Sequence, residues 1–343
     1  MILRHIRLFI AVGVVWFIVY SFRQSHPSTL RTTQPQDVCA AHRWKPFKQS
    51  PSTPPRKVYT LLMVNTELDM LEVHLNTTYH AVDHFVLVEG AQTFTGHPKP
   101  LHLKPSLSSL SSYAPKIIYH EITYPLSFRP KTPWNIEDFQ RNALLTQALT
   151  GPSTPNPNDV LIVADIDEIP RPSTISLLRA CAFPRRTTLF SKFYYYSFQH
   201  RHVGPEWPHP QATTYHGRAT ILPNDLRTNT GFFLTAWLQR GGIANAAWHC
   251  SSCFGTIEEF LTKMRSFSHV WMNGEVYRDR RRIVERVGQG KDLWDREGEV
   301  FEKVEGNEDV PGFLREGEEG RRRFGYMVER DEKGAGFKDW EGE

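Results

Sequence analysis

Two aspartates separated by one residue, Asp165 and Asp167, are the groups in this 343-residue chain whose type and spacing best suit chemistry. They follow the unbroken apolar run 160–164, which predicts a short strand buried on both faces. Side chains alternate along a strand, so both carboxylates should point the same way at its carboxyl end, where open α/β sheets bind ligands. The pair predicts a site for a divalent cation, Mn²⁺ or Mg²⁺, because such ions take oxygen ligands. Solvated loop acids or helix caps are the alternative.

Glu168 follows the pair directly, but an ideal strand would point its side chain to the opposite face. A role shared with the aspartates would therefore require the strand to bend, and a place at the core edge or in a helix cap is favoured for Glu168. Pro170 and Pro172 end the strand, and Ser173 can cap a following helix.

The first half of the chain alternates strand and helix patterns that would position these acids. Apolar runs predict strands over 58–64, 85–88 and 116–120, and apolar residues spaced by three and four predict a helix over 68–82. A second helix is expected over 134–149. A β-α-β order implies parallel strands joined by a right-handed crossover. We therefore predict an α/β fold with a mostly parallel central sheet covered by helices.

Composition narrows the function. The net charge of +4 is mild and gives no indication of nucleic-acid binding. No P-loop, zinc-protease or serine-nucleophile motif supports a phosphotransferase or hydrolase. The second half is rich in aromatic residues, whose faces suit the apolar C–H faces of sugar rings, although an ordinary aromatic core is the alternative for any one residue.

The amino-terminal region predicts a membrane anchor. Residues 8–22 are almost entirely apolar and follow two arginines, and no small-residue cleavage site comes after them. The run is short for a spanning helix, which needs about 20 residues. We predict a cytosolic tail over 1–7, a transmembrane signal anchor over 8–22, a flexible stem over 23–56, a single catalytic domain over 57–331 and a frayed tail over 332–343. The catalytic domain would lie in the lumen of the secretory route.

The cysteines fit such a compartment, which is oxidising. The chain has Cys39, Cys181, Cys250 and Cys253, and without a second C-x-x-C the last two are not half of a four-cysteine zinc site. We predict a disulfide between Cys250 and Cys253. Asn76 begins the only N-glycosylation sequon, on a predicted helix.

Several short motifs follow one another along the chain. They are NTELDMLE at 65–72, VEG at 88–90 with TFTG at 93–96, DIDEIPRP at 165–172, WHCSSCF at 248–254, SFSH at 266–269 and GKDL at 290–293. This ordered set resembles glycosyltransferase family 17 over about 57–331, and its motifs are specific only as a set. The resemblance implies a Rossmann-like nucleotide-sugar glycosyltransferase fold in a Golgi membrane enzyme. Such an enzyme would transfer N-acetylglucosamine from UDP-GlcNAc to a mannose of a protein-linked N-glycan, with inversion.

In such an enzyme the acids at the strand ends would bind the donor. Asp165 and Asp167 would between them hold the cation and the ribose. Asn65 and Glu89 end two earlier strands and should line the same crevice as the nucleotide. Arg141 could contact a phosphate bidentately, with a helix-surface ion pair as the alternative.

Inversion also needs a general base to take the proton of the acceptor hydroxyl. Glu206, in an aromatic loop, and His249, as a base or a third metal ligand, are weak candidates, and a structural role is the alternative for each. Two other functions remain open. One is a membrane-anchored carbohydrate-binding protein with a structural cation, and the other is a transferase with a different donor or acceptor.

Overall fold

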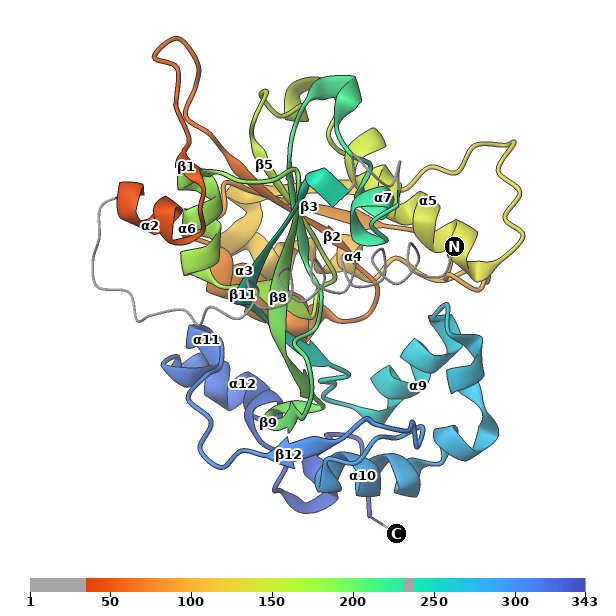
Figure 1. The fold of residues 1–343 in the computed structure, drawn as a ribbon. Coiled ribbons are helices and arrows are strands. Elements are labelled where there is room, and N and C mark those ends of the chain that lie inside the picture. Colours follow the sequence, from red (N-terminus) through yellow and green to blue (C-terminus); the bar gives the residue numbers. More distant parts are fainter. Residues whose placement is uncertain (1–34, 231–236, 343) are drawn as a thin grey trace, which may run out of the picture.

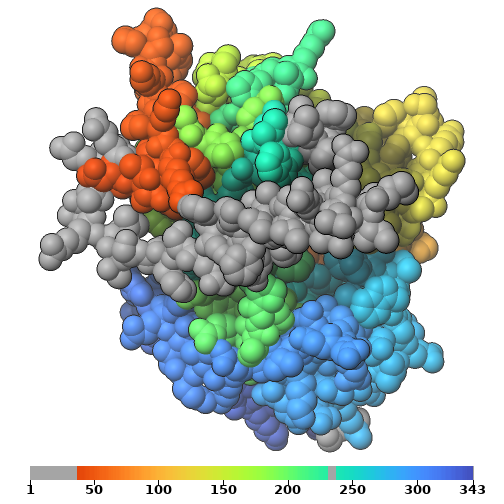
Figure 2. Space-filling model, in the orientation of Figure 1, coloured from red at the N-terminus to blue at the C-terminus, as the bar shows by residue number. Residues whose placement is uncertain are grey.

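The computed structural model describes residues 35–230 and 237–342. A central sheet runs through the molecule, with the helices of the first half packed around it and the C-terminal helices gathered at one end (Figure 1). Residues 252–342 are called the C-terminal part below. In the space-filling view this part, in blue, forms the lower part of the molecule (Figure 2). Residues of both parts line one common cleft.

Four parallel strands form the half of the sheet that the β-α-β pattern predicted. They are β2 (Val58–Met63), β3 (His84–Glu89), β4 (Ile117–Glu121) and β5 (Val160–Ala164), in the order β5-β2-β3-β4. Helix α3 (Leu68–Thr78) makes the crossover between β2 and β3. The predicted strands and the predicted helix between the first two are thus confirmed, and β5 delivers the two aspartates to the carboxyl edge of the sheet.

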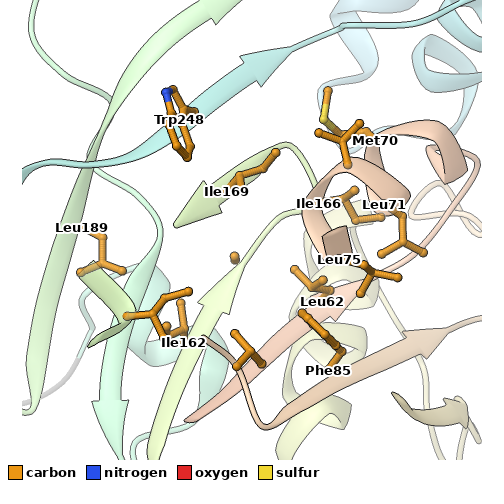
Figure 3. Packing of buried hydrophobic residues seen from close by; sticks show 14 of the residues in the cluster. Leu62, Met70, Leu71, Leu75, Phe85, Ile162, Ile166, Ile169, Leu189 and Trp248 are labelled. Carbon is orange, nitrogen blue, oxygen red and sulfur yellow. The ribbon is translucent and has the colours of Figure 1, made fainter. Parts of the chain in front are cut away.

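Helix α3 covers one face of this parallel half (Figure 3). Its Leu71 and Leu75 pack in one fully buried cluster with Leu62 and Phe85 of the sheet. The neighbouring strand residue Leu61 faces the opposite core, beneath a second helix. Each such side chain contributes about 1.5–3 kcal/mol by its burial. The strands are therefore fixed from both sides.

The second helix is α5 (Pro133–Thr146), which packs on β2 and β3 through Ala143 and Leu144. It begins at a capping box in which the side chains of Thr132 and Asn135 each accept the other residue's backbone N–H. The capping box fixes where the helix begins. It thereby also determines which polar side chains of α5 face the carboxyl edge of the sheet.

The other half of the sheet is not parallel, so the prediction of a mostly parallel sheet is wrong. Strand β10 (Gln211–Thr214) pairs antiparallel with both β5 and β8 (Arg186–Tyr195), and β9 (Ser197–His202) pairs antiparallel with β8. Parallel neighbours need a long crossover, whereas antiparallel neighbours need only a tight turn. Tyr196 alone, at φ 67°, separates β8 from β9.

The last strands tie this half to the C-terminal part. Strand β11 (Arg240–Ser251) runs parallel to β8 and antiparallel to the short β6 (Glu168–Pro170), which completes a mixed ten-stranded sheet with β12 (Phe301–Lys303) at one edge. Two helices complete the frame of the cleft, α7 (Pro223–Arg227) beside α5 and α9 (Ile257–Ser266) after β11.

The N-terminal segment of the described chain is folded, which corrects part of the predicted flexible stem over 23–56. A disulfide joins Cys39 of α2 (Pro35–Ala41) to Cys181, and β1 (Lys45–Pro46) pairs with the strand that begins at Cys181. The low apolar content of this segment hid these contacts, because a disulfide and a two-residue strand leave no periodic pattern.

The C-terminal tail is also folded, so the prediction that 332–343 frays is wrong. Phe337 is buried, and the carboxylate of Asp339 accepts hydrogen bonds from the backbone N–H groups of Ile257 and Glu258 at 2.7 and 3.1 Å. Two N–H groups that a helix start leaves unpaired are thereby satisfied. The tail consequently holds the beginning of α9.

No helix within 35–230 or 237–342 is long and apolar enough to cross a membrane. The predicted cytosolic tail over 1–7 and the anchor over 8–22 lie outside the described residues. Both stay predictions.

Candidate active site

A cleft of about 510 Å³ opens where the carboxyl edge of the parallel strands meets the C-terminal part. Its walls combine acids, bases and aromatic rings, which suits a charged ligand that also carries sugar rings. The strand ends and α5 supply one wall, and β8, β11 and the C-terminal part supply the other. The main lining residues are Asn65, Trp134, Glu137, Arg141, Asp165, Asp167, Glu168, Phe193, Tyr195, Trp207, Arg227, His249, Lys263, His269, Trp294, Arg296 and Glu299.

The chain turns sharply where β5 ends, and this turn brings Glu168 to the side of Asp165. The backbone N–H of Glu168 donates to the carbonyl of Asp165 at 3.0 Å, and the backbone N–H of Asp165 donates to Glu168 Oε2 at 2.9 Å. Glu168 is fully buried yet contributes to the cleft wall. The expectation that it points to the opposite face is therefore wrong, because the ideal alternation stops at the turn.

Arg227, at the end of α7, binds both acids of the turn. Its Nη2 lies 2.5 Å from Asp165 Oδ2, and its Nη1 lies 2.7 Å from Glu168 Oε2. Burial alone would raise the pKa of Glu168, but the Arg227 guanidinium outweighs it and holds that pKa well below its usual range. The sequence offered no nearby cation for Asp165, and the fold supplies one from 62 residues away.

Asp167 is held much more loosely than Asp165. Its Oδ1 lies 3.6 Å from His249 Nδ1, and its Oδ2 lies 3.8 Å from Lys263 Nζ, both longer than a hydrogen bond. Burial raises the pKa of Asp167, while His249 and Lys263 act in the opposite direction. This carboxylate is therefore the acid of the turn that remains available to a ligand.

His249 presents a nitrogen to the same place. Its ring packs against those of both Trp207 and Phe193, with each centroid 4.9 Å away, and these two rings also touch each other at 5.7 Å. Its buried Nδ1 has no hydrogen-bond partner among the described residues. A separation of 3.6 Å from Asp167 Oδ1 suits two ligands of one ion, since bonds to Mg²⁺ are about 2.0–2.1 Å long.

No group of three His, Cys, Asp or Glu side chains in the described part of the chain is arranged to hold a metal ion. This does not conflict with the predicted cation. Mg²⁺ sites that act on phosphates commonly use only one or two protein carboxylates and complete the shell with phosphate oxygens and water. Asp167 and His249 fit such a partial site.

Arg141 is buried in the cleft wall, not on a helix surface. Its Nη2 donates to Glu137 Oε1 at 2.8 Å and lies 3.4 Å from Asp165 Oδ1. The expected ion pair exists, but it is internal, because α5 turns both residues toward the cleft. Arg141 therefore stands beside the acidic turn.

The structure separates the other two predicted donor-site residues. Asn65 lines the cleft, where its Nδ2 donates to Ser266 Oγ at 3.3 Å. Glu89 is fully buried and is not among the cleft residues. Its carboxylate accepts the backbone N–H groups of His102, Leu103 and Lys104 at the start of a short helix. The expectation that Glu89 lines the crevice is thus corrected, because a loop folds back over this strand end.

The two weak candidates for the base also differ in position. His249 lines the cleft, whereas Glu206 is not among its lining residues. The Glu206 carboxylate instead accepts the backbone N–H of Asn245 at 3.0 and 3.2 Å, and burial raises its pKa. Glu206 therefore stabilises the irregularity within β11, where Asn245 has a φ of 50°.

The predicted disulfide between Cys250 and Cys253 is present, at the end of β11. It lies next to the site, since the Cys250 N–H donates to the Asp167 carbonyl at 3.0 Å. Asn76 lies in α3, where its Nδ2 donates to Tyr113 Oη at 3.3 Å. Its glycosylation stays a prediction.

Sequence reasoning missed Arg227, Lys263 and Glu299, which come from α7, α9 and the loop before β12. No local pattern marks these three residues, because what distinguishes them is proximity to a site far away in the sequence.

Comparison with known proteins adds to this geometry. The model of glycosyltransferase family 17 matches residues 23–305. β-1,4-Mannosyl-glycoprotein 4-β-N-acetylglucosaminyltransferases of Homo sapiens and Rattus norvegicus are each 26% identical to the chain over 239 residues. These matches cover 60% of the chain but only 42% and 41% of the two relatives, so the chain spans less than half their length.

A solved mannosyltransferase, PcManGT from Pyrobaculum calidifontis in complex with GDP-Man and Mn²⁺, is 13% identical to the chain. The match covers 71% of the chain and 67% of that structure, with a TM-score of 0.32. This score is too low for any inference to rest on it.

Proposed function

Because the chain belongs to glycosyltransferase family 17, we propose that it transfers N-acetylglucosamine from UDP-GlcNAc to a mannose of a protein-linked N-glycan. The observation that carries the proposal is the cleft at the end of β5. There a loosely held acid, Asp167, faces an unpartnered nitrogen of His249 and the ammonium of Lys263. Such a group of charges suits a nucleoside diphosphate that must leave with its negative charge stabilised.

The two aspartates of the acidic turn would bind different parts of the donor. Asp167 and His249 would hold a divalent cation, Mn²⁺ or Mg²⁺, which supplies a Lewis acid for the phosphate oxygens. Asp165 is fixed by Arg227 and Arg141 and can accept a ribose hydroxyl. A carboxylate that two guanidiniums orient loses little freedom on binding.

Lys263 gives the protein a cation of its own at this point. Its ammonium lies 3.8 Å from Asp167 and near the rings of Phe254 and Phe267, 5.3 and 5.8 Å from their centroids. It is not locked in a short ion pair, so it can donate to an oxygen of the diphosphate. Charge developing on the leaving group would thereby meet a donor that is already in place.

The cell compartment belongs to the same proposal. We place the catalytic domain in the Golgi lumen, behind the type II anchor predicted over 8–22. The Cys39–Cys181 and Cys250–Cys253 disulfides support an oxidising compartment.

Donor turnover tests the function directly. The full chain is incubated with UDP-sugars and GDP-sugars, Mn²⁺ or Mg²⁺, and an N-glycan with exposed mannose. We expect UDP release and glycan modification with UDP-GlcNAc, and loss of both after chelation. Turnover of another nucleotide sugar would change the donor, and glycan binding without any turnover would indicate a carbohydrate-binding protein instead.

A further inference from the structure

Seven carboxylates of the described residues line the cleft, and several of them are already engaged. Arg227 holds Asp165 and Glu168, with contacts of 2.5 and 2.7 Å. Glu137 is paired with Arg141 at 2.8 Å. The seven are Glu67, Glu137, Asp138, Asp165, Asp167, Glu168 and Glu299.

The remaining four carboxylates differ in the part of the molecule from which they reach the cleft. Asp167 lies beside His249, at the proposed cation site. Glu67 and Asp138 belong to the α/β part, just before α3 and on α5. They share that part of the molecule with the acids that would bind the diphosphate. An inverting displacement needs its base on the face of the sugar opposite the leaving group. Among the seven, Glu299 is the carboxylate that comes from the C-terminal part, across the cleft from the α/β part.

The backbone next to Glu299 is fixed by a hydrogen bond, whereas its side-chain Oε2 has no hydrogen-bond partner among the described residues. It lies in the loop before β12, where the N–H of Val203 donates to the carbonyl of Val300 at 2.8 Å. Its side chain is 29% exposed. Its Oε2 is enclosed and has no hydrogen-bond partner among the described residues, although His202 Nε2 lies 3.4 Å away. Oε2 is thus turned toward His202, and the exposed fraction of the side chain belongs to its other atoms.

The charged groups around Glu299 are few. His202 approaches from β9, and Arg296 belongs to the same loop. The Arg296 guanidinium is held by Asp292, with 2.6 Å between Nη2 and Oδ1, and lies 3.4 Å from the Tyr195 hydroxyl. Asp292 is therefore the short-range partner of Arg296, which acts on Glu299 only through a longer-range charge interaction.

Aromatic rings separate Glu299 from the cation site. The ring of Phe193 lies 4.9 Å from that of His249 and 5.1 Å from that of His202, so it spans the distance between the two groups. Tyr195 and Trp294 continue the aromatic wall of the cleft. A sugar ring resting on these faces would present a hydroxyl to Glu299 and leave room for the donor sugar beside Asp167.

We propose that Glu299 is the general base of the transfer, an inference that rests on the proposed function. The acceptor oxygen forms a bond to the anomeric carbon of the donor sugar, and its proton moves to the Glu299 carboxylate. The bond from that carbon to the diphosphate oxygen breaks, and its electron pair leaves with the nucleoside diphosphate. His202, beside Oε2, is a positioning residue that orients the carboxylate.

The test compares Glu299→Gln with Glu297→Gln, an exposed acid of the same loop that does not line the cleft. We expect Glu299→Gln to lower kcat by about 10²–10⁴-fold, the usual share of general-base catalysis, without changing UDP affinity in calorimetry or the melting temperature. In the parent, kcat/KM should fall at low pH, and this decrease should be smaller in Glu299→Gln because the proposed base is missing while Asp167 still becomes protonated. Glu297→Gln should behave like the parent, and Glu299→Asp should keep part of the activity.

Each other outcome contradicts the assignment. Full activity of Glu299→Gln, or a loss that follows unfolding or lost UDP binding, would remove Glu299 as the base. Loss of the acidic limb in Asp138→Asn or Glu67→Gln instead would move the role to that residue. If the parent itself transfers no sugar while still binding UDP, the proposed function fails first and the base assignment fails with it.

Discussion

At the scale of single residues, the acids of the turn after β5 have different duties. Asp165 and Glu168 share the Arg227 guanidinium, whereas both contacts of Asp167 exceed 3.5 Å. Removing one partner of a buried ion pair lowers the free energy of unfolding strongly, because the other charge stays buried without compensation. We therefore expect the loss of Asp165 to affect stability more than the loss of Asp167, although both would contact the donor.

Asp167→Asn should lower transfer activity by at least about 10²-fold, the typical loss when a charge-stabilising contact is removed. The melting temperature should stay the same or rise, because burial raises the pKa of Asp167 and an amide avoids that cost. Asp165→Asn should lower the free energy of unfolding by about 1.5–3 kcal/mol, since Arg227 loses a charged hydrogen bond.

Kinetics and thermal melting of both variants, with the exposed Asp37→Asn as control, separate these effects. Near-parent activity of Asp167→Asn would contradict its place at the diphosphate. Equal melting temperatures for all the variants would show that Asp165 does not stabilise the fold.

His200 gives the fold a pH dependence. Burial, followed by Arg330 and Lys303, lowers the pKa of His200 from 6.5 to about 4. The folded state thus resists protonation more than the unfolded state does. Its stability contribution is full above about pH 6.5 and is lost as the pH falls toward 4.

We therefore expect the free energy of unfolding in urea to decrease between about pH 6.5 and 4, and to decrease less in His200→Gln. The exposed His97→Gln serves as control and should keep the parent's slope. A His200→Gln slope equal to that of the parent would show that the ring does not control this decrease.

At the scale of elements, the two disulfides stabilise the fold to different extents because the loops that they close differ greatly in length. Cys39–Cys181 spans 142 residues and ties α2 to the strand that begins at Cys181, whereas Cys250–Cys253 spans 3 and shapes the end of β11. A cross-link restricts the unfolded chain more when the loop it closes is longer.

The double variant Cys39→Ala/Cys181→Ala should lose about 5 kcal/mol of unfolding free energy, against roughly 1.6 kcal/mol for Cys250→Ala/Cys253→Ala, by the chain-entropy relation. The second pair should instead affect activity, because the Cys250 N–H holds the Asp167 carbonyl. Urea titrations and donor turnover measure the two effects. A larger stability loss from the short loop would refute this ordering.

At the scale of the whole molecule, the C-terminal part completes the cleft that the α/β part begins. Lys263, Trp294 and Glu299 all come from it, and Asp339 holds the start of the helix that carries Lys263. The site is therefore assembled only when the end of the chain is in place.

Deletion of 332–343 should lower both the melting temperature and the transfer activity, since it removes Asp339 and the buried Phe337. Deletion of 341–343 alone should change neither, because Glu341 and Gly342 are exposed. Thermal melting and donor turnover of the two truncations provide the comparison. If the longer deletion has full activity and stability, the tail is not part of the assembled site.

The sequence by itself determined what is local. Apolar runs and helical spacing predicted β2, β3, β4, β5 and α3, because hydrophobic periodicity acts over a few neighbouring residues. The position of Asp165 and Asp167 at a strand end followed from the same signals. The Cys250–Cys253 disulfide was predicted from the close spacing of the two cysteines and the oxidising compartment expected for them.

Only the tertiary structure decided what depends on long-range proximity. No periodic pattern marks the mixed half of the sheet, the turn that brings Glu168 beside Asp165, or the covering of Glu89 by a loop. Arg227 reaches Asp165 across 62 residues, and Glu299 reaches the cleft from the C-terminal part. Such contacts form when distant segments pack together, and packing is a property of the whole chain, not of any stretch within it.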